Sequence, residues 1–421
     1  MASQKPSVVF FNRVYPPSRG ATGRMLRDLA RAFSDKGWHV TVVTTGSKSR
    51  RGYDGAIRII RVKAPVRTKR MSAYLFVWLR MFWTGLNLPK HDLVVTMTDP
   101  PMLVVAGRFI ASLKKSRHIH WCQDLYPDII PALGMNITRS RMGFYKKLSR
   151  KSMKRCDKVI TIGRCMAKQL THSGLEPRRV AVIPNWPDNE LLLEENSLQL
   201  LRRPVPSLHD AEGARPFDQL LTDGAERKFR ILYSGNLGRA HPVETVLGAA
   251  EILAQQHTDI EFVFVGDGQS YERLAQERAK RGLENIRLLP FQPASRLREL
   301  MESGDLHLVT MKHESAGMLV PCKLYAALAV ARPCIFVGPE NSEIARVITD
   351  FGAGSVVPQG DASRLAEEII KYRFDSGVWF KAHEGAAKAG QVFVPEQSYE
   401  AWMKRALDVV NPPNKGQRRA A

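Results

Sequence analysis

The sequence predicts an α/β protein made of two Rossmann-like domains, each built around a parallel β-sheet. Three observations lead to this fold class. The chain has 421 residues, which is more than one hydrophobic core usually serves. Short apolar runs alternate with amphipathic stretches of helical length, as expected of βαβ units. The alternation stops once, over residues 188–228, and then begins again, so two separate sheets are expected.

The first domain is expected to span residues 1–187. Its strands are predicted at residues 7–12, 39–46, 57–62, 92–98, 118–124, 158–163 and 181–185. A helix is predicted at about residues 24–36. The longest apolar stretch, residues 71–88, contains Arg80 near its middle, and this charge argues against a helix that crosses a membrane.

Residues 188–228 are rich in proline and charge, which is typical of a linker with an irregular insertion. The second domain is expected at residues 229–392. Its strands are predicted at residues 229–236 and 260–268 and in the segments IRLLPF, DLHLVTM, PCIFVG and AGSVVPQG, and its helices at residues 243–256 and 271–281. The remaining residues, 393–421, are expected to form a helix that returns to the first domain and then a polar tail.

Composition and charge restrict the possible functions. Hydrophobic residues make up 44% and charged residues 25% of the chain, so an ordered globular protein is expected. The net charge of +22 calls for an anionic partner, such as a lipid headgroup, a phosphorylated substrate or nucleic acid. The five cysteines are scattered without zinc-site spacing, which favours reduced thiols in the cytosol. The N-terminal residues lead directly into a strand, so no signal peptide is predicted.

A glycine-bearing loop joins the first predicted strand to its helix. Glycine lets the backbone approach a ligand closely, and a helix N-terminus offers free N–H groups to an anion. The loop can therefore hold a phosphate or an acceptor, although a turn that packs strand against helix explains the glycines equally well. The candidate residues of this loop are Arg19, Gly20, Gly23 and Arg24.

Similar loops follow the strands of the second half. Gly235, Asn236 and Arg239 come directly after one strand, at the edge where parallel sheets bind ligands. An arginine there can donate charge-assisted hydrogen bonds to a diphosphate. Lys323, at the start of a later helix, is a second candidate for the diphosphate. For both cations, a solvated side chain on the surface is the alternative interpretation.

Two further features belong to the first half. Asp124 ends a predicted strand, where a carboxylate can act as a base or orient an acceptor hydroxyl, or can cap the next turn. Residues 139–158 carry nine Lys or Arg and one acid, with apolar residues at helical spacing. Such a helix can bind an anionic membrane surface, or simply expose a charged face. The candidate membrane residues are Lys147, Arg150, Lys151 and Lys154. No nucleic-acid-binding motif is present, so nucleic acid is not an expected partner.

These segments together resemble the family 4 glycosyltransferases, especially the branch of bacterial capsule, O-antigen and colanic-acid sugar transferases. The resemblance rests on the segments YPPSRGATGRMLRDLARAFSDKGWHVTVVTTG, QDLYPDIIPALG, VITIG, VIPNW, LYSGNLGRAHPVETVLGAA, VFVGDG, LLPFQP and VPCKLYAALAVARPCI. They follow the family order over nearly the whole chain. The resemblance implies the GT-B fold, in which two Rossmann-like domains with parallel sheets face each other across a cleft.

The resemblance also implies an activity. A sugar would move, with retention of configuration, from a nucleotide diphosphate sugar to a saccharide acceptor, lipid-linked or polyprenyl-diphosphate-linked, in surface polysaccharide synthesis. The enzyme would work at the cytoplasmic face of the membrane, with no cofactor and no bound metal. The catalytic positions would be Asp124 and Glu314. The donor-binding residues would be Gly235, Asn236, Arg239, Asp267, Gly268, Phe291, Gln292, Gly317 and Lys323.

The sequence departs from the family pattern at two positions. Ala326 stands where many relatives have the second of two paired glutamates, which holds the donor ribose, and Gln123 stands where many have a histidine. Ala326 favours one alternative function, a scaffold in a polysaccharide assembly complex. A nucleotide-sugar epimerase of the same fold is a second alternative, although the sequence does not point to the carboxylates and histidine that it would need in the cleft. The donor base, the sugar, the acceptor, the linkage and the oligomeric state are not specified by the sequence.

Overall fold

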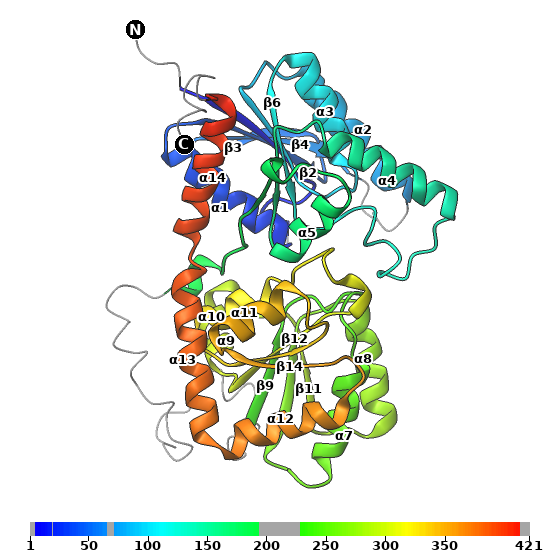
Figure 1. Cartoon of the computed structure of the whole chain (residues 1–421), viewed down its shortest axis with the longest axis vertical. Coiled ribbons are helices and arrows are strands. Elements are labelled where there is room, and N and C mark those ends of the chain that lie inside the picture. The colour runs from blue at the N-terminus through cyan, green and yellow to red at the C-terminus, as the bar shows by residue number, and fades with distance from the viewer. Residues whose placement is uncertain (1–4, 19, 65–70, 193–227, 413–421) are drawn as a thin grey trace.

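Two separate β-sheets organise the chain (Figure 1). The computed structural model describes residues 5–18, 20–64, 71–192 and 228–412. One sheet belongs to the N-terminal half and the other to the C-terminal half, and helices cover both sheets. The predicted fold class, two α/β domains with parallel sheets, is therefore confirmed.

The sheet of the first domain has the strand order β3-β4-β2-β1-β5-β6-β7-β8. Its strands are β1 (Ser7–Phe11), β2 (His39–Gly46), β3 (Arg50–Asp54), β4 (Ile57–Lys63), β5 (Leu93–Thr96), β6 (Arg117–Cys122), β7 (Lys158–Thr161) and β8 (Val180–Val182). All neighbouring strands are parallel except β3, which pairs with β4 in the antiparallel direction. β3 was not predicted, because its sequence RRGYD lacks an apolar run. An edge strand can lack one, since it does not fill the centre of the sheet.

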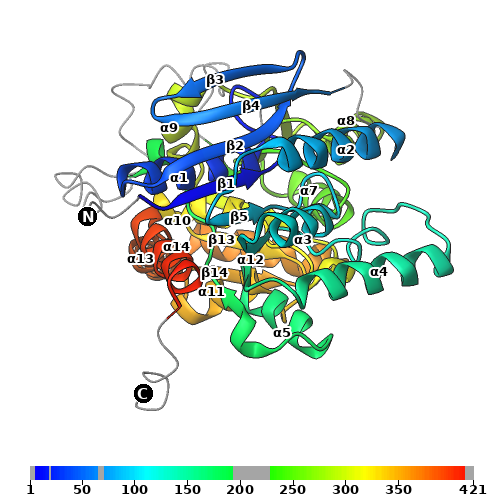
Figure 2. The same ribbon diagram turned by 90° about the horizontal axis from the view of Figure 1, so that it is seen from above.

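The helices of this domain are α1 (Ala21–Asp35), α2 (Met71–Asn87), α3 (Leu103–Lys114), α4 (Arg139–Met153) and α5 (Arg164–His172). α3 packs against both α2 and α4, and Figure 2 shows the three along one side of the domain. None of the helices in the described part of the chain is both long and apolar enough to span a membrane.

The sheet of the second domain is entirely parallel, in the order β11-β10-β9-β12-β13-β14. Its strands are β9 (Phe229–Ser234), β10 (Ile260–Val265), β11 (Ile286–Leu289), β12 (Leu306–Thr310), β13 (Cys334–Val337) and β14 (Gly354–Val357). Its helices are α7 (Glu244–Ala254), α8 (Gln269–Arg281), α9 (Leu297–Glu302), α10 (Lys323–Ala329), α11 (Glu343–Phe351), α12 (Ala362–Phe374) and α13 (Ser376–Val392). Most residues of the central strands are apolar because both faces of the sheet are covered. Arg230 of β9 and Glu261 of β10 are exceptions, and they are buried as an ion pair with 2.8 Å between Nε and Oε1.

The last helix, α14 (Pro395–Val410), leaves the second domain and packs against α1 and β6 of the first (Figure 1). Trp402 of α14 meets Trp121 of β6 edge to face, with 4.9 Å between ring centroids. Trp186 stacks on Trp121 on one side and meets Tyr399 of α14 on the other. The three tryptophans are fully buried, so α14 completes the core of the first domain.

The two domains contact each other directly. Arg164 of α5 binds Glu343 of α11 twice, through its Nε at 2.9 Å and through its backbone N–H at 2.6 Å. Leu125, just after β6, donates its N–H to the carbonyl of Met318 at 2.7 Å. Residues from both domains belong to one continuous hydrophobic cluster. The loops that follow β6 and precede α10 are therefore held side by side.

We expect Trp402→Ala to lower the free energy of unfolding by about 3–5 kcal/mol, because it leaves a cavity beside two other buried tryptophans. Thermal melting followed by tryptophan fluorescence measures the change. Leu407→Ala, on the same helix but 39% exposed, is the control and should change stability by no more than about 0.5 kcal/mol. Equal losses in the two variants would contradict a role for α14 in this core.

Candidate functional site

The candidate site lies where strand-end loops of both sheets meet. Asp124, just after β6, forms an isolated antiparallel bridge with Leu319, in the loop before α10. Residues 132–133 of the first domain accept hydrogen bonds from side chains that follow β9 and β12 of the second. The carboxyl ends of parallel strands are where α/β folds bind ligands, so the two binding edges face the same boundary.

Glycines that follow β9 and β10 pack closely against each other and against Lys323 in the second domain. β9 ends at Ser234 and is followed by Gly235, whose φ is +122°. A Cβ on Gly235 would lie 3.2 Å from Cε of Lys323, and a Cβ on Gly266, after β10, would lie 2.2 Å from the carbonyl oxygen of Gly235. Larger residues at either position would push the strand ends apart or displace Lys323.

Lys323 is the first residue of α10, and its ammonium group lies against the end of β9. Its Nζ is 5.0 Å from the centroid of the Tyr233 ring, which is a cation–π distance. Burial lowers the pKa of Lys323 to about 8. A partly desolvated cation beside a glycine loop suits an anion that could replace the lost water.

Two more cations reach from the second domain to one loop of the first. Arg239 donates from Nη1 to the carbonyl of Leu133 at 3.3 Å and from Nε to the side chain of Gln269. Lys312, just after β12, donates from Nζ to the carbonyl of Ala132 at 3.4 Å. A hollow between these residues is lined by both cations and by Gly134, Gln359 and Arg273, among others. Lys312 was not predicted, although its place just beyond a strand end was the available signal.

His241 connects the two groups of cations. It lines the same hollow as Arg239 and Lys312, and its Nδ1 donates to the carbonyl of Thr310. Burial, followed by the nearby charge of Lys323, lowers the pKa of His241 to about 3. The ring is therefore neutral at physiological pH, with Nε2 as a hydrogen-bond acceptor. No role was predicted for this histidine.

An acidic pair lies at the strand ends of the first domain. Arg13, after β1, binds Asp99, after β5, with 2.7 Å between Nε and Oδ1. Asp124 follows β6, the next strand in the sheet. Burial, followed by the negative charge of Asp99, raises the pKa of Asp124 to about 7. A carboxyl group that titrates near neutral pH at this edge suits proton transfer or hydroxyl binding.

Three more predicted residues follow strands of the second sheet: Asn236 follows β9, Asp267 follows β10 and Glu314 follows β12. Asn236 is exposed, and a Cβ on Gly268 would lie 2.6 Å from its Oδ1. Asp267 accepts the N–H of Gly268 at 2.6 Å. Glu314 is exposed in the short 3₁₀ helix η5 (His313–Ser315).

Two predicted residues lie in the loop after β11, and one lies in the loop before α10. Phe291 is 41% exposed, and Gln292 donates its side-chain amide to the carbonyl of Pro290. Gly317, with φ of +72°, lies against the backbone of Cys165 in α5, at the contact between the domains. The donor-binding roles of these residues and the catalytic role of Glu314 stay predictions.

The first glycine loop packs on itself. A Cβ on Gly23 would lie 2.8 Å from Cγ1 of Val14, and one on Gly20 would lie 3.0 Å from the same atom. The alternative of a turn that packs helix against strand therefore describes these glycines. Arg19 lies outside the described residues.

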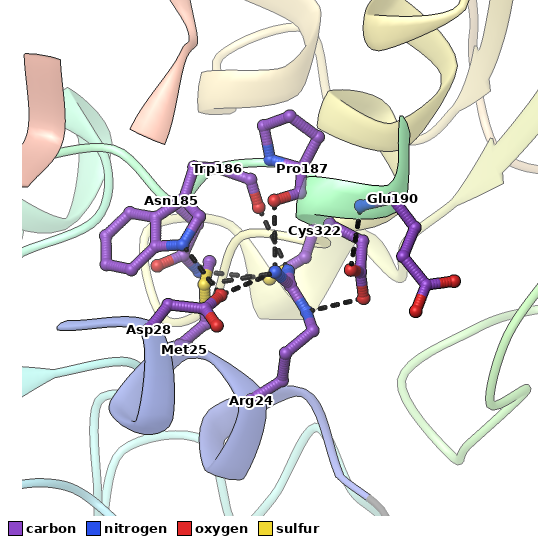
Figure 3. Close-up of polar contacts among 9 residues, drawn as sticks. Arg24, Met25, Asp28, Asn185, Trp186, Pro187, Glu190 and Cys322 are labelled. Atoms are coloured by element: carbon purple, nitrogen blue, oxygen red, sulfur yellow. Dashed lines mark hydrogen bonds and ion pairs between the residues drawn. The ribbon is translucent and has the colours of Figure 1, made fainter. Parts of the chain in front are cut away.

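Arg24 contacts the segment that leaves the first domain (Figure 3), and its predicted role at a phosphate or acceptor stays a prediction. Its guanidinium donates to Asp28 at 3.1 Å and to the carbonyls of Trp186 and Pro187 at 3.0 Å each. Its Nε lies 3.4 Å from Asp188. Because every side of the guanidinium is engaged, Arg24 ties α1 to the segment 186–188.

The two departures from the family pattern lie beside Lys323. Gln123 and Asn185 exchange side-chain hydrogen bonds of 3.0 and 2.8 Å, and Asn185 also donates to Sγ of Cys322 at 2.9 Å. Gln123 thus links β6 to the residue before Lys323. Ala326 is three residues after Lys323, on the same helix face, and its methyl group offers no hydrogen bond.

Of the four candidate membrane residues in the basic segment 139–158, three are exposed and one is not. Lys147, Lys151 and Lys154 are exposed. Arg150 is only 13% exposed, because its guanidinium binds the buried Asp128 at 2.9 Å. Its charge is therefore paired inside the domain, which corrects its assignment to the surface.

Comparisons with known proteins give the family of the two domains. Residues 20–186 match the glycosyl transferase 4-like domain, and residues 222–390 match the glycosyl transferases group 1 domain. The chain is 27% identical over 266 residues to the putative colanic acid biosynthesis glycosyl transferase WcaI of Escherichia coli. That match covers 62% of this chain and 61% of WcaI, so it spans less than two thirds of the relative.

Solved structures share the fold of the whole chain. WaaG, a glycosyltransferase involved in lipopolysaccharide biosynthesis, has a TM-score of 0.68 at 18% identity over 96% of this chain and 100% of its own. HepE of Anabaena in complex with UDP-glucose has a TM-score of 0.65 at 16% identity over 94% and 98%. These likenesses confirm the GT-B fold implied by the sequence. The chain therefore belongs to the glycosyltransferases, with a glycosyl transferase 4-like domain followed by a glycosyl transferases group 1 domain.

Proposed function

We propose that the protein transfers a sugar from a nucleotide diphosphate sugar to a saccharide acceptor during synthesis of a surface polysaccharide. The observation that carries the proposal is the partly desolvated Lys323 over the Gly235 loop. Arg239 and Lys312 line a hollow together with His241, whose pKa the charge of Lys323 helps to lower. Support comes from HepE, whose structure holds UDP-glucose, and from WcaI and WaaG, which are named for colanic acid and lipopolysaccharide synthesis.

The cations suit the charge that develops when a nucleoside diphosphate leaves. Breaking the bond between sugar and diphosphate increases negative charge on the phosphate oxygens, and preorganised cations stabilise that charge most in a site with little water. Lys323 is suited to this task because it is already desolvated. Arg239 and Lys312, which now bond to backbone carbonyls of the first domain, can exchange these partners for phosphate oxygens.

Asp124 suits the acceptor side of the reaction. Its carboxylate can accept a hydrogen bond from the acceptor hydroxyl and orient it towards the anomeric carbon. The transfer proceeds in this proposal with retention, and the leaving diphosphate takes up the hydroxyl proton. Loss of the ribose contact at Ala326 favours a second candidate, a donor-poor homologue that acts as a scaffold. The donor assays below separate the two.

The acceptor is proposed to be lipid-linked, with the protein attached to the cytoplasmic face of a membrane. Large apolar side chains are exposed on three adjoining helices: Leu75, Phe76, Leu79 and Trp83 on α2, Phe109 and Leu113 on α3, and Phe144 on α4. Lys147 and Lys151 are also exposed on α4, where they follow Phe144. Apolar side chains ringed by cations are typical of surfaces that bind anionic lipid. We call these seven apolar residues the apolar face.

We expect binding of a nucleoside diphosphate to weaken above pH 8, because Lys323 then loses its proton in the free protein while a bound diphosphate favours the charged form. The dissociation constant should rise by up to about tenfold per pH unit. Calorimetry at pH 7, 8 and 9 measures this, with whichever of UDP, GDP and ADP raises the melting temperature most.

The variants assign the effect to its residue. Lys323→Ala should weaken binding by about 1–3 kcal/mol at pH 7 and abolish the pH dependence, whereas Arg239→Ala should weaken binding and keep it. No thermal shift with any of the three nucleotides would favour the scaffold.

Asp124→Asn should lower kcat/KM by at least about 10²-fold. In the unmodified protein the rate should fall as pH drops below about 7, because the carboxylate becomes protonated.

The same raised pKa predicts an effect on stability. Folding favours the protonated carboxyl, a contribution that is lost as pH rises through about 7, so Asp124→Asn should melt at a higher temperature than the unmodified protein at pH 8. Full activity of the Asp124→Asn variant would rule out the proposed role of Asp124 on the acceptor side.

Vesicles that contain phosphatidylglycerol should bind the protein, and binding should weaken as salt increases. Leu75→Ser with Leu79→Ser should reduce binding at least about tenfold, since each removes exposed apolar area from the contact. The matched control is Val392→Ser with Leu407→Ser, two exposed aliphatic residues on α13 and α14. Equal binding by both pairs, measured by co-sedimentation, would contradict the proposed membrane face.

A further inference from the structure

An arginine-rich hollow lies at the β3 edge of the first sheet, between the β3–β4 hairpin and α2. Arg50, Arg51, Arg61 and Arg80 line it together with Ser49 and Trp83, among others. None of its lining residues in the described part of the chain is Asp or Glu. Neither the proposed donor site nor the proposed acceptor side uses these residues, so the hollow requires a separate explanation.

The arrangement of like charges in the hollow is unfavourable without an anion. Arg50 and Arg61 are direct partners across the antiparallel β3–β4 pair. Like charges placed opposite each other destabilise such a pair. Burial lowers the pKa of Arg61 and outweighs the effect of Tyr15, which raises it; the charge of Arg50 lowers this pKa further, and the charge of Asp54 raises it. The carbonyls of Pro16 and Thr45 accept from Arg61, but these neutral groups do not cancel the repulsion. A bound anion would.

The hydrogen bonds around Ser49 are arranged for donation to such an anion. Its hydroxyl oxygen accepts the N–H of Lys63 at 3.1 Å and one N–H of Arg80, also at 3.1 Å. With both acceptor positions of the oxygen used, the hydroxyl hydrogen is left to donate. Arg80 reaches this hydroxyl from α2, over the ring of Phe76 at 5.6 Å. Arg80 and Ser49 thus connect α2 to the start of β3 at the rim of the hollow.

The place of the hollow identifies the kind of anion. Trp83 of α2 lines it and is 60% exposed, and it belongs to the apolar face. Figure 2 shows α2 beside the β2–β4 part of the sheet, on the side of the domain that α3 and α4 share. An anion bound here would sit beside side chains suited to the acyl region of a bilayer.

We propose that this hollow binds the phosphate group of an anionic membrane lipid. The inference rests on the membrane attachment proposed above and goes beyond it by naming a defined headgroup site. Arg51 and Arg80 would each offer two N–H donors to phosphate oxygens, a fork that lysine lacks. Ser49 would donate its hydroxyl. The neighbouring apolar side chains would enter the bilayer, so α2 would be fixed in depth and orientation.

Charge-conserving variants test the headgroup site. Arg51→Lys with Arg80→Lys keeps both positive charges but removes both forks. We expect this double variant to bind vesicles of phosphatidylcholine with phosphatidylglycerol at least about fivefold more weakly than the unmodified protein. Lys147→Arg with Lys151→Arg, the reverse change on α4, is the matched control and should bind at least as well as the unmodified protein. Unchanged binding by the Arg→Lys variant, with an unchanged melting temperature, would overturn the proposal.

A competition arm distinguishes lipid from soluble phosphate. At constant ionic strength, inorganic diphosphate should release the unmodified protein from vesicles but should have little effect on the Arg51→Lys, Arg80→Lys variant. Equal release of both proteins would overturn the proposal. Thermal stabilisation by diphosphate that depends on these arginines, combined with unchanged vesicle binding, would assign the hollow to a soluble phosphate compound and overturn the lipid assignment.

The two membrane proposals fail in different ways. If Leu75→Ser with Leu79→Ser lowers vesicle binding while the arginine variant does not, the apolar face is retained and the headgroup site is lost. If neither pair changes binding, both are lost. Sugar transfer to a soluble saccharide acceptor should persist in the arginine variant, because no residue of the hollow belongs to the proposed donor or acceptor residues. This assay therefore separates the hollow from the catalytic proposal.

Discussion

The placement of the site depends on the short segment that leaves the first domain, residues 184–188. Its carbonyls at Trp186 and Pro187 are held by Arg24 of α1, and the Trp186 ring is buried between Trp121 and Tyr399. The side chain of Asn185 reaches in two directions, to Gln123 beside the acceptor side and to Cys322 next to Lys323. One buried amide thus connects the end of β6 in the first domain to the residue before α10 in the second. A buried group of this kind tolerates little movement, since each lost partner leaves an unsatisfied donor or acceptor.

Burial shifts the pKa of one charged group on each side of the site. Burial makes the charged form less favourable for Lys323 and for Asp124, so both titrate closer to neutral pH than they would in water. Arg239 is exposed, so it is less desolvated than Lys323. The site therefore combines an exposed cation with two groups whose charge responds to a ligand. Such groups are destabilising in the empty protein and become favourable when a substrate supplies the missing partner.

Much of the fold could be predicted because it is encoded by local pattern. Alternating apolar runs and amphipathic helices gave both sheets, and strand-end glycines marked Gly235 and Lys323 for the donor side. Edge strand β3 was missed because it has no apolar run. The task of Arg24 could not be predicted, since its carbonyl partners lie some 160 residues away in sequence. Arg150 presented the same difficulty: only the folded chain places Asp128 against it. His241 and Lys312 could not be assigned to the site from the sequence, because their contacts join segments that are far apart in the chain.

The return of α14 to the first domain has a consequence for how the protein is made. Trp121 and Trp186 are translated long before Trp402, the residue that covers Trp121, and the whole second sheet lies between them. While the ribosome is still producing that sheet, the emerging first domain exposes an aromatic surface that only the last helix can cover. The second domain, whose helices end with α13, can complete its own core earlier. Nascent chains that stall before α14 are therefore the species most prone to chaperone capture and aggregation.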